Sequence, residues 1–83
     1  MSGRSAQEIL KILVDIIRNV KDVGRAITAN DDIRQLGLDS LDTINYLFSV
    51  EEAFGLAVPV EILEEKELFT IQAMIEYLQA TQK

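Results

Sequence analysis

The chain has 83 residues, no cysteine and no histidine, and its formal net charge is −6. This length allows one domain, and the absence of cysteine excludes a disulfide framework and a thiolate metal site. Ser-His-Asp and Cys-His catalysis cannot be assembled either, so any thiol chemistry must be imported on a cofactor. The composition argues against a self-contained enzyme and indicates a single globular domain over residues 1–83.

The acidic excess is confined to the later part of the chain. Residues 1–29 carry five basic and three acidic side chains, whereas residues 30–83 carry eleven acidic and three basic ones. Such a surface repels nucleic acid and favours partners with basic patches, although simple solubility explains most acidic small domains. Lys11, Asp15 and Arg18 interrupt the first apolar run, and no stretch approaches the roughly 20 apolar residues of a membrane span. We expect a cytoplasmic monomer without membrane insertion.

A first helix is expected at about residues 5–21. Ser5 and Glu8 have the spacing of a capping box, and apolar residues then recur at the spacing of one helical face. Residues 22–38 lack this periodicity, which predicts a long connection with one helical turn near residues 31–36. Its apolar residues predict that the connection is pinned to the core and is not a flexible linker.

Three further helices are expected after this connection. Asp39 and Ser40 offer capping chemistry for a second helix, which is expected to run to about Phe54 and to stop at a glycine. A short helix is expected near residues 60–66, and a last helix is expected to begin with Thr70 as its cap. The predicted fold class is therefore all-α, a four-helix bundle with a long loop between helices one and two and a short third helix.

On a helical wheel the second helix divides into three sectors. The core face comprises Thr43, Tyr46, Leu47, Val50 and Phe54. A polar back comprises Asp42, Ser49 and Ala53. The third sector mixes apolar residues with carboxylates and comprises Ser40, Leu41, Ile44, Asn45, Phe48, Glu51 and Glu52. Apolar anchors ringed by charge are what a partner-docking surface needs, but coverage by the third helix or the long loop explains them equally well.

Ser40 has two interpretations. A serine at a helix start is most often a cap. In favour of a second role, Gly37 gives a flexible approach and a helix N-terminus favours an incoming anion such as a phosphodiester. Asp39 can take over the capping, which would leave the Ser40 hydroxyl free.

The surrounding residues resemble a known family. Residues 37–41 (GLDSL) resemble the attachment motif of acyl carrier proteins. Residues 39–44 and 50–55 resemble the family's second helix, residues 58–59 its entry to helix three, and residues 70–73 the start of helix four. The resemblance therefore covers nearly all of the chain, in the right order.

This resemblance implies that Ser40 is esterified with 4'-phosphopantetheine by a Mg²⁺-dependent phosphopantetheinyl transferase that uses coenzyme A. Asp39 would then lie near the transferase's metal site, and no residue of this chain would be catalytic. Acyl groups would be carried on the phosphopantetheine arm as thioesters. They would be presented to acyl-transferring, condensing and modifying enzymes with basic docking patches. The positions that match the family's docking helix are Leu41, Ile44, Asn45, Phe48, Glu51 and Glu52.

Some positions depart from the pattern of fatty-acid carriers. Asn45 and Ala53 stand where acidic residues are common, and Phe48 makes the docking face bulkier. Tyr46 replaces an aliphatic residue on the core face, where its ring would narrow any interior acyl pocket. These differences argue against a housekeeping fatty-acid carrier and suit a specialised polyketide, lipid-modification or amino-acid-loading carrier about as well.

Two other functions stay open from the residues alone. One is a helical protein-interaction adaptor that keeps the carrier fold without the arm and needs no free hydroxyl at Ser40. The other is an enzyme, for which Glu64, Glu65 and Glu67 would be the acid/base candidates. A Glu-rich stretch on a short helix is, however, usually a solvated face.

Overall fold

Four helices and their connections make up residues 4–81, the part of the chain that this computed structural model describes. Residues 1–3 and 82–83, the ends of the expected domain, lie outside the described residues. The helices are α1 (Ala6–Val20), α2 (Ser40–Phe54), α3 (Val60–Glu65) and α4 (Ile71–Thr81). The described part of the chain is thus all-helical, with the predicted long loop between α1 and α2 and the predicted short third helix.

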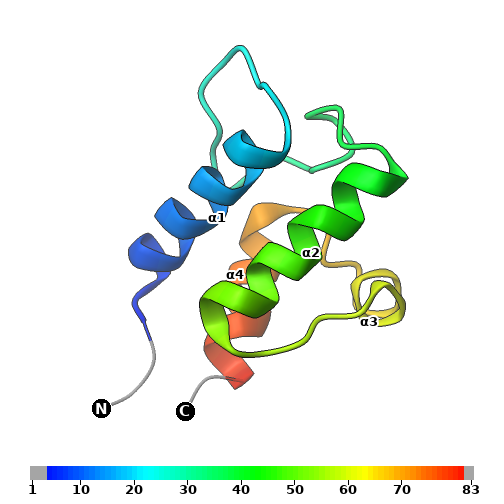
Figure 1. Ribbon diagram of the computed structural model, residues 1–83. Coiled ribbons are helices and arrows are strands. Elements are labelled where there is room, and N and C mark those ends of the chain that lie inside the picture. The colour runs from blue at the N-terminus through cyan, green and yellow to red at the C-terminus, as the bar shows by residue number, and fades with distance from the viewer. Residues whose placement is uncertain (1–3, 82–83) are drawn as a thin grey trace.

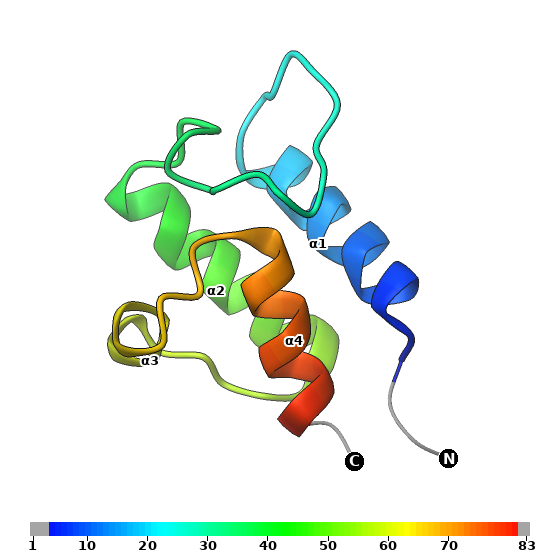
Figure 2. The same cartoon turned by 180° about the vertical axis from the view of Figure 1, so that it is seen from behind.

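The three longer helices pack together and α3 closes one side. α1 and α2 lie beside each other and run in opposite directions, with α4 behind them (Figure 1). Seen from behind, α4 lies in front of α2 (Figure 2). Both views show α3 nearly end-on, so it runs across the other three. Within residues 4–81, no helix is long and apolar enough to cross a membrane.

The start of α1 follows from its capping box. The Ser5 hydroxyl accepts a hydrogen bond from the Glu8 backbone N–H at 3.2 Å, and the Glu8 carboxylate accepts one from the Ser5 N–H at 3.0 Å. At the other end, the Lys21 N–H donates to the Ile17 carbonyl as the C-cap. The predicted bounds are therefore confirmed to within one residue.

The long loop is fastened to the beginning of α4 by backbone hydrogen bonds. The Ile33 N–H donates to the Phe69 carbonyl at 2.9 Å, and the Ile71 N–H donates to the Asp31 carbonyl at 3.0 Å. These bonds form a short antiparallel bridge that the sequence pattern does not predict. The predicted pinning of the loop is confirmed, because Ile33 is buried. The predicted helical turn near residues 31–36 is present as a single turn, in which the Leu36 N–H donates to the Asp32 carbonyl at 3.1 Å, and it does not continue into a longer helix.

Every element contributes to one hydrophobic core. Leu13 of α1, Tyr46 of α2, Leu63 of α3, Met74 of α4 and Ile33 of the loop are all nearly or fully buried. Burying an aliphatic side chain of this size contributes about 1.5–3 kcal/mol. Because α2 commits one face to this core, its orientation is fixed and its opposite face is left at the surface.

Candidate functional site

The beginning of α2 is held by a capping box made of two carboxylates. Asp39 precedes the helix, and its Oδ1 accepts a hydrogen bond from the Asp42 backbone N–H at 2.8 Å. The Asp42 Oδ2 accepts one from the Asp39 N–H at 3.3 Å. Because the Asp42 N–H donates to it, the pKa of the Asp39 carboxyl lies below its usual range, and Lys21 lowers it further. The prediction that Asp39 caps this helix is confirmed.

Ser40 is the first residue of α2, and its side chain is not needed for the cap. The residue is exposed, and its Oγ forms no hydrogen bond with any residue in the described range. The chain approaches it through Gly37, whose φ of 96° is accessible to glycine without steric cost. The Ser40 hydroxyl therefore stands at the surface without a partner in residues 4–81, as the sequence predicted.

A groove of about 420 Å³ runs from Ser40 along α3. It lies between the start of α2, the end of the long loop, α3 and the segment that precedes α4. Its lining residues are Arg34, Leu38, Asp39, Ser40, Thr43, Ile44, Val60, Leu63, Glu64 and Phe69. The groove thus places a mostly apolar trough, with charges at its rim, next to the exposed hydroxyl.

The outer face of α2 carries apolar side chains that no other element covers. Leu41 is 67% exposed, Phe48 is 63% exposed and Ile44 is 39% exposed. The other members of the predicted docking face, Asn45, Glu51 and Glu52, are exposed as well. The alternative in which α3 or the long loop simply covers these apolar residues is therefore wrong for Leu41 and Phe48.

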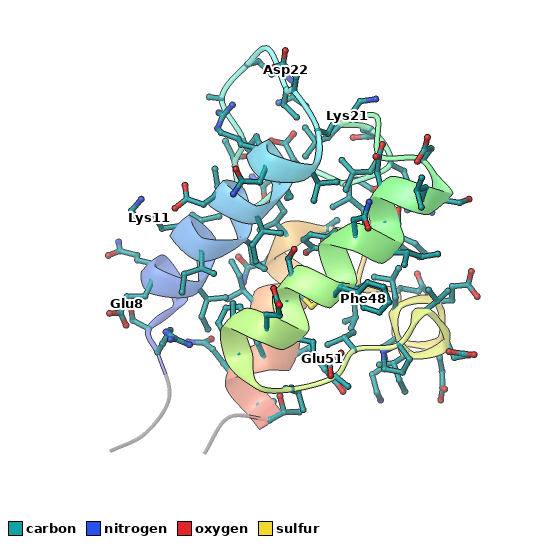
Figure 3. The ribbon with its side chains drawn as sticks, viewed as in Figure 1. Glu8, Lys11, Lys21, Asp22, Phe48 and Glu51 are labelled. Carbon is teal, nitrogen blue, oxygen red and sulfur yellow. The ribbon has the colours of Figure 1, made fainter. Side chains whose placement is uncertain are left out.

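A second groove, of about 320 Å³, lies alongside this face. It is bordered by α2 and by the α2–α3 connection, and it is lined by Ile44, Leu47, Phe48, Glu51, Ala57, Val58, Pro59 and Val60. Phe48 and Glu51 project from the side of α2 that faces this connection (Figure 3). The apolar face and the carboxylate at its far end thus form one continuous surface.

The sector of α2 interpreted as a polar back lies beside α1. Its residues Asp42, Ser49 and Ala53 are half-buried. The Lys21 Nζ lies 3.9 Å from the Asp42 Oδ2, and the Arg4 Nη1 lies 3.5 Å from the Ala53 carbonyl oxygen. Both cations flank the ends of α1, so this sector is an interhelical flank and not a polar back.

The sequence did not predict the groove beside Ser40, and it gave no functional role to Arg34 or Phe69, which line it. The Arg34 guanidinium carbon lies 3.9 Å from the centroid of the Phe69 ring, a cation–π arrangement. Both residues lie in irregular segments, where no periodic pattern reports a contact between side chains. No pattern in the sequence predicts that these two side chains are in contact.

The structure offers little else for catalysis in the described residues. No group of three or more histidine, cysteine or acidic side chains in residues 4–81 is arranged to hold a metal ion. Glu64, Glu65 and Glu67 are exposed to solvent, as expected of a solvated face. An unblocked surface hydroxyl beside an open groove fits a phosphate ester, because the bulky ester has room and the helix cap does not depend on it.

Comparison with known proteins gives the class of this domain. The family described as "Phosphopantetheine attachment site" matches residues 7–78. The chain is also 33% identical over 78 residues to the mitochondrial acyl carrier protein of Dictyostelium discoideum. That alignment covers 93% of this chain and 63% of the relative, so the chain spans somewhat less than two thirds of the relative's length.

The helical fold and the family match define a phosphopantetheine-bearing domain. Together with the similarity to the mitochondrial relative, they show that the chain belongs to the acyl carrier protein family. The cofactor of this family is 4'-phosphopantetheine. Members of this family are carriers and not catalysts.

Proposed function

We infer that this protein carries acyl groups as thioesters on a 4'-phosphopantetheine arm attached to the Ser40 Oγ. The observation that carries this proposal is the exposed Ser40 hydroxyl at the start of α2, left unused by the helix cap because Asp39 fills that role. The bound arm supplies the thiol on which a thioester forms, and the chain has no cysteine of its own. The protein is then a non-catalytic carrier.

The attachment reaction uses coenzyme A and a Mg²⁺-dependent phosphopantetheinyl transferase. A bond forms between the Ser40 Oγ and the phosphorus that carries the pantetheine. The bond from that phosphorus to the adenosine bisphosphate breaks, and the bisphosphate leaves. The hydroxyl proton passes to a base of the transferase, and the family resemblance implies that Asp39 would lie near the transferase's metal.

Mass spectrometry tests the attachment point directly. The protein is incubated with a promiscuous phosphopantetheinyl transferase, Mg²⁺ and coenzyme A, and the mass is expected to rise by one phosphopantetheine group. Ser40→Ala is expected to abolish this gain. Ser49→Ala is the matched control, because Ser49 lies on the same helix but is half-buried, and it is expected to leave the gain unchanged.

Two results would overturn parts of the proposal. Modification of the Ser40→Ala protein would show that the arm is attached elsewhere. A wild-type protein that stays unmodified in its host, yet captures its partner regardless of Ser40→Ala, would favour the helical adaptor that keeps the fold without the arm. The exposed apolar face of α2 serves either role, so only the arm separates them.

The docking face that supports acyl transfer consists of Leu41, Ile44, Asn45, Phe48, Glu51 and Glu52. All six are exposed, and the acidic pair suits enzymes that present lysine and arginine around the entrance to their active sites. The partners proposed on this basis are acyl-transferring, condensing and modifying enzymes of fatty-acid, polyketide or related lipid biosynthesis. Exposed apolar anchors provide the contact area, and the two carboxylates steer the approach.

Charge reversal tests the steering. Glu51→Lys combined with Glu52→Lys is expected to slow reaction with a partner enzyme about tenfold or more at low salt, and the difference should shrink at high salt. Asp15→Lys combined with Glu76→Lys is the control, since it makes the same total charge change at two exposed positions on α1 and α4, away from this face. An equal slowing by both variants would mean that net charge, and not this face, sets the rate.

A further inference from the structure

Arg34 is held in one orientation by three contacts. Its Nε donates to the Asp32 Oδ1 at 3.0 Å, and its Nη2 donates to the Asp32 Oδ2 at 2.6 Å. This is the two-bond fork that a guanidinium forms with a carboxylate. The guanidinium also lies over the Phe69 ring, 3.9 Å from its centroid. Such contacts fix a side chain whose charged end would otherwise move freely in solvent.

The platform that holds Arg34 is itself rigid. Asp32 is paired with Thr70 in the bridge between the long loop and the start of α4. The Asp32 Oδ1 also accepts a hydrogen bond from the Arg34 backbone N–H at 2.8 Å. The Gly37 N–H donates to the Arg34 carbonyl at 3.2 Å, so the chain turns back from Arg34 toward the start of α2. The position of the guanidinium therefore follows from the fold.

Part of the guanidinium remains available for another ligand. A guanidinium has five N–H donors, and the fork with Asp32 uses one on Nε and one on Nη2. No residue in the described range accepts a hydrogen bond from the Arg34 Nη1. The side chain is 62% exposed, whereas that of Asp32 is only 14% exposed. The open donors thus face solvent or the groove.

Arg34 and Ser40 line the same groove. Among the described residues that line it, Arg34 is the only basic one, while Asp39 and Glu64 are acidic. A phosphodiester on the Ser40 Oγ is an anion that both carboxylates repel. The favourable place for its free oxygens is therefore the side of the groove where the oriented guanidinium lies.

On this basis, and given the proposed arm on Ser40, we propose that Arg34 binds the phosphodiester of the phosphopantetheine and directs the arm into the groove along α3. Arg34 is then a positioning residue. Its role is to bias where the arm rests between encounters with partner enzymes. The contact is partly exposed to water, so it holds the arm weakly enough for partners to withdraw it.

Lys21 is the rival cation at this end of the molecule. Its Nζ lies 3.9 Å from the Asp42 Oδ2, and it lowers the pKa of Asp39. It does not line the groove that contains Ser40. If general positive charge near the start of α2 were sufficient to hold the phosphate, Lys21 would serve as well as Arg34.

Phosphorus NMR of the modified protein distinguishes these cases. The phosphodiester resonance of the folded wild-type protein is expected to differ from that of the same protein in denaturant, and added salt should reduce the difference. Arg34→Gln is expected to remove most of this difference, whereas Lys21→Gln should leave it in place. An unchanged resonance in Arg34→Gln, or a loss caused by Lys21→Gln alone, would overturn the proposal.

A second measurement needs no substitution. Nuclear Overhauser effects between the geminal methyl protons of the pantetheine and the Phe69 ring are expected in the wild-type modified protein, because Phe69 lines the groove under Arg34. If Arg34→Gln fails to fold, the presence of this effect supports the proposal and its absence overturns it. Failure of Ser40 attachment is seen separately, as a protein that gains no arm in mass spectrometry.

Discussion

α1 and α2 are each fifteen residues long and each begins with a capping box, but they use their serines and their outer faces differently. In α1 the hydroxyl of Ser5 is the cap itself. In α2 the cap moves one residue earlier, to the carboxylate of Asp39, and Ser40 falls inside the helix with its hydroxyl unused. The capping box therefore uses the serine hydroxyl as the cap in α1, whereas in α2 it leaves the serine hydroxyl free.

The outer faces of α1 and α2 also differ in polarity. The outer face of α1 is polar, and the large apolar residues that the described chain leaves most exposed are Leu41 and Phe48 of α2. A helix that serves only the core gains nothing from apolar groups in water. The comparison teaches that α1 is a structural helix, whereas α2 is built both to pack inward and to present residues outward.

The largest expected contrast is between two leucines, one on each helix. Leu13 of α1 is fully buried, so Leu13→Ala is expected to lower the free energy of unfolding by about 2–5 kcal/mol. Leu41 of α2 is 67% exposed, so Leu41→Ala is expected to change the free energy of unfolding by less than about 0.5 kcal/mol. Urea unfolding followed by circular dichroism measures both. A similar loss in the two variants would show that Leu41 is covered in solution.

The inward face of α2 contains a buried polar group that lowers the stability of the core, in contrast to its exposed outer face. Tyr46 is fully buried, and its hydroxyl has no hydrogen-bond partner within residues 4–81. Burial also raises the pKa of this phenol above its ordinary value. An unsatisfied buried polar group costs about 1–3 kcal/mol, so Tyr46→Phe is expected to raise the free energy of unfolding by about that amount. A loss of stability would instead reveal an acceptor for the hydroxyl.

The two serines give a smaller but more direct contrast. Ser5→Ala removes a cap and is expected to cost about 1 kcal/mol. Ser40→Ala is expected to cost less than about 0.5 kcal/mol in the unmodified protein, because Asp39 keeps the cap. Thermal or urea unfolding of the two variants, side by side, checks this. If Ser40→Ala costs as much as Ser5→Ala, the Ser40 hydroxyl is a structural group and not a free one.

Most of the fold could be predicted from the sequence because the start, the end and the buried face of a helix are specified by residues that lie close together in the chain. The capping boxes at Ser5 and Asp39, the apolar spacing of each helix and the terminal Gly55 specify where elements begin and end. Gly55 adopts a φ of 67°, which ends α2 in the left-handed conformation that glycine favours. The exposed position of Ser40 followed from the same local rules. None of these features depends on which helix packs against which.

The remaining features depend on contacts between distant segments. The bridge that joins the long loop to α4 uses backbone groups, which carry no signature of residue type. The half-burial of Asp42 and Ser49 reflects the position of α1, which a helical wheel of α2 alone cannot supply. Arg34 is placed by Asp32 and by a ring from another segment, so its part in the groove becomes visible only in three dimensions.

The smallest expected effect is a difference in pH dependence between the cap of α1 and the cap of α2. The pKa of the Asp39 carboxyl is depressed below the ordinary value of 3.8 because the Asp42 N–H donates to it. The cap's contribution to stability is therefore fully present above pH 3.8 and is lost as the pH falls through the lower folded value. The Ser5 hydroxyl that caps α1 does not titrate in this range.

The amide signals of the residues that receive these caps report the difference. The Asp42 N–H signal is expected to move as the pH falls below 3.8. Asp39→Asn is the matched variant, because asparagine caps a helix as well as aspartate but carries no titrating carboxyl, and its Asp42 signal should lose that component. A wild-type Asp42 signal that stays flat through this range would mean that the carboxylate is not the acceptor. In that case Ser40 would be the remaining candidate for the cap, and the contrast between α1 and α2 would disappear.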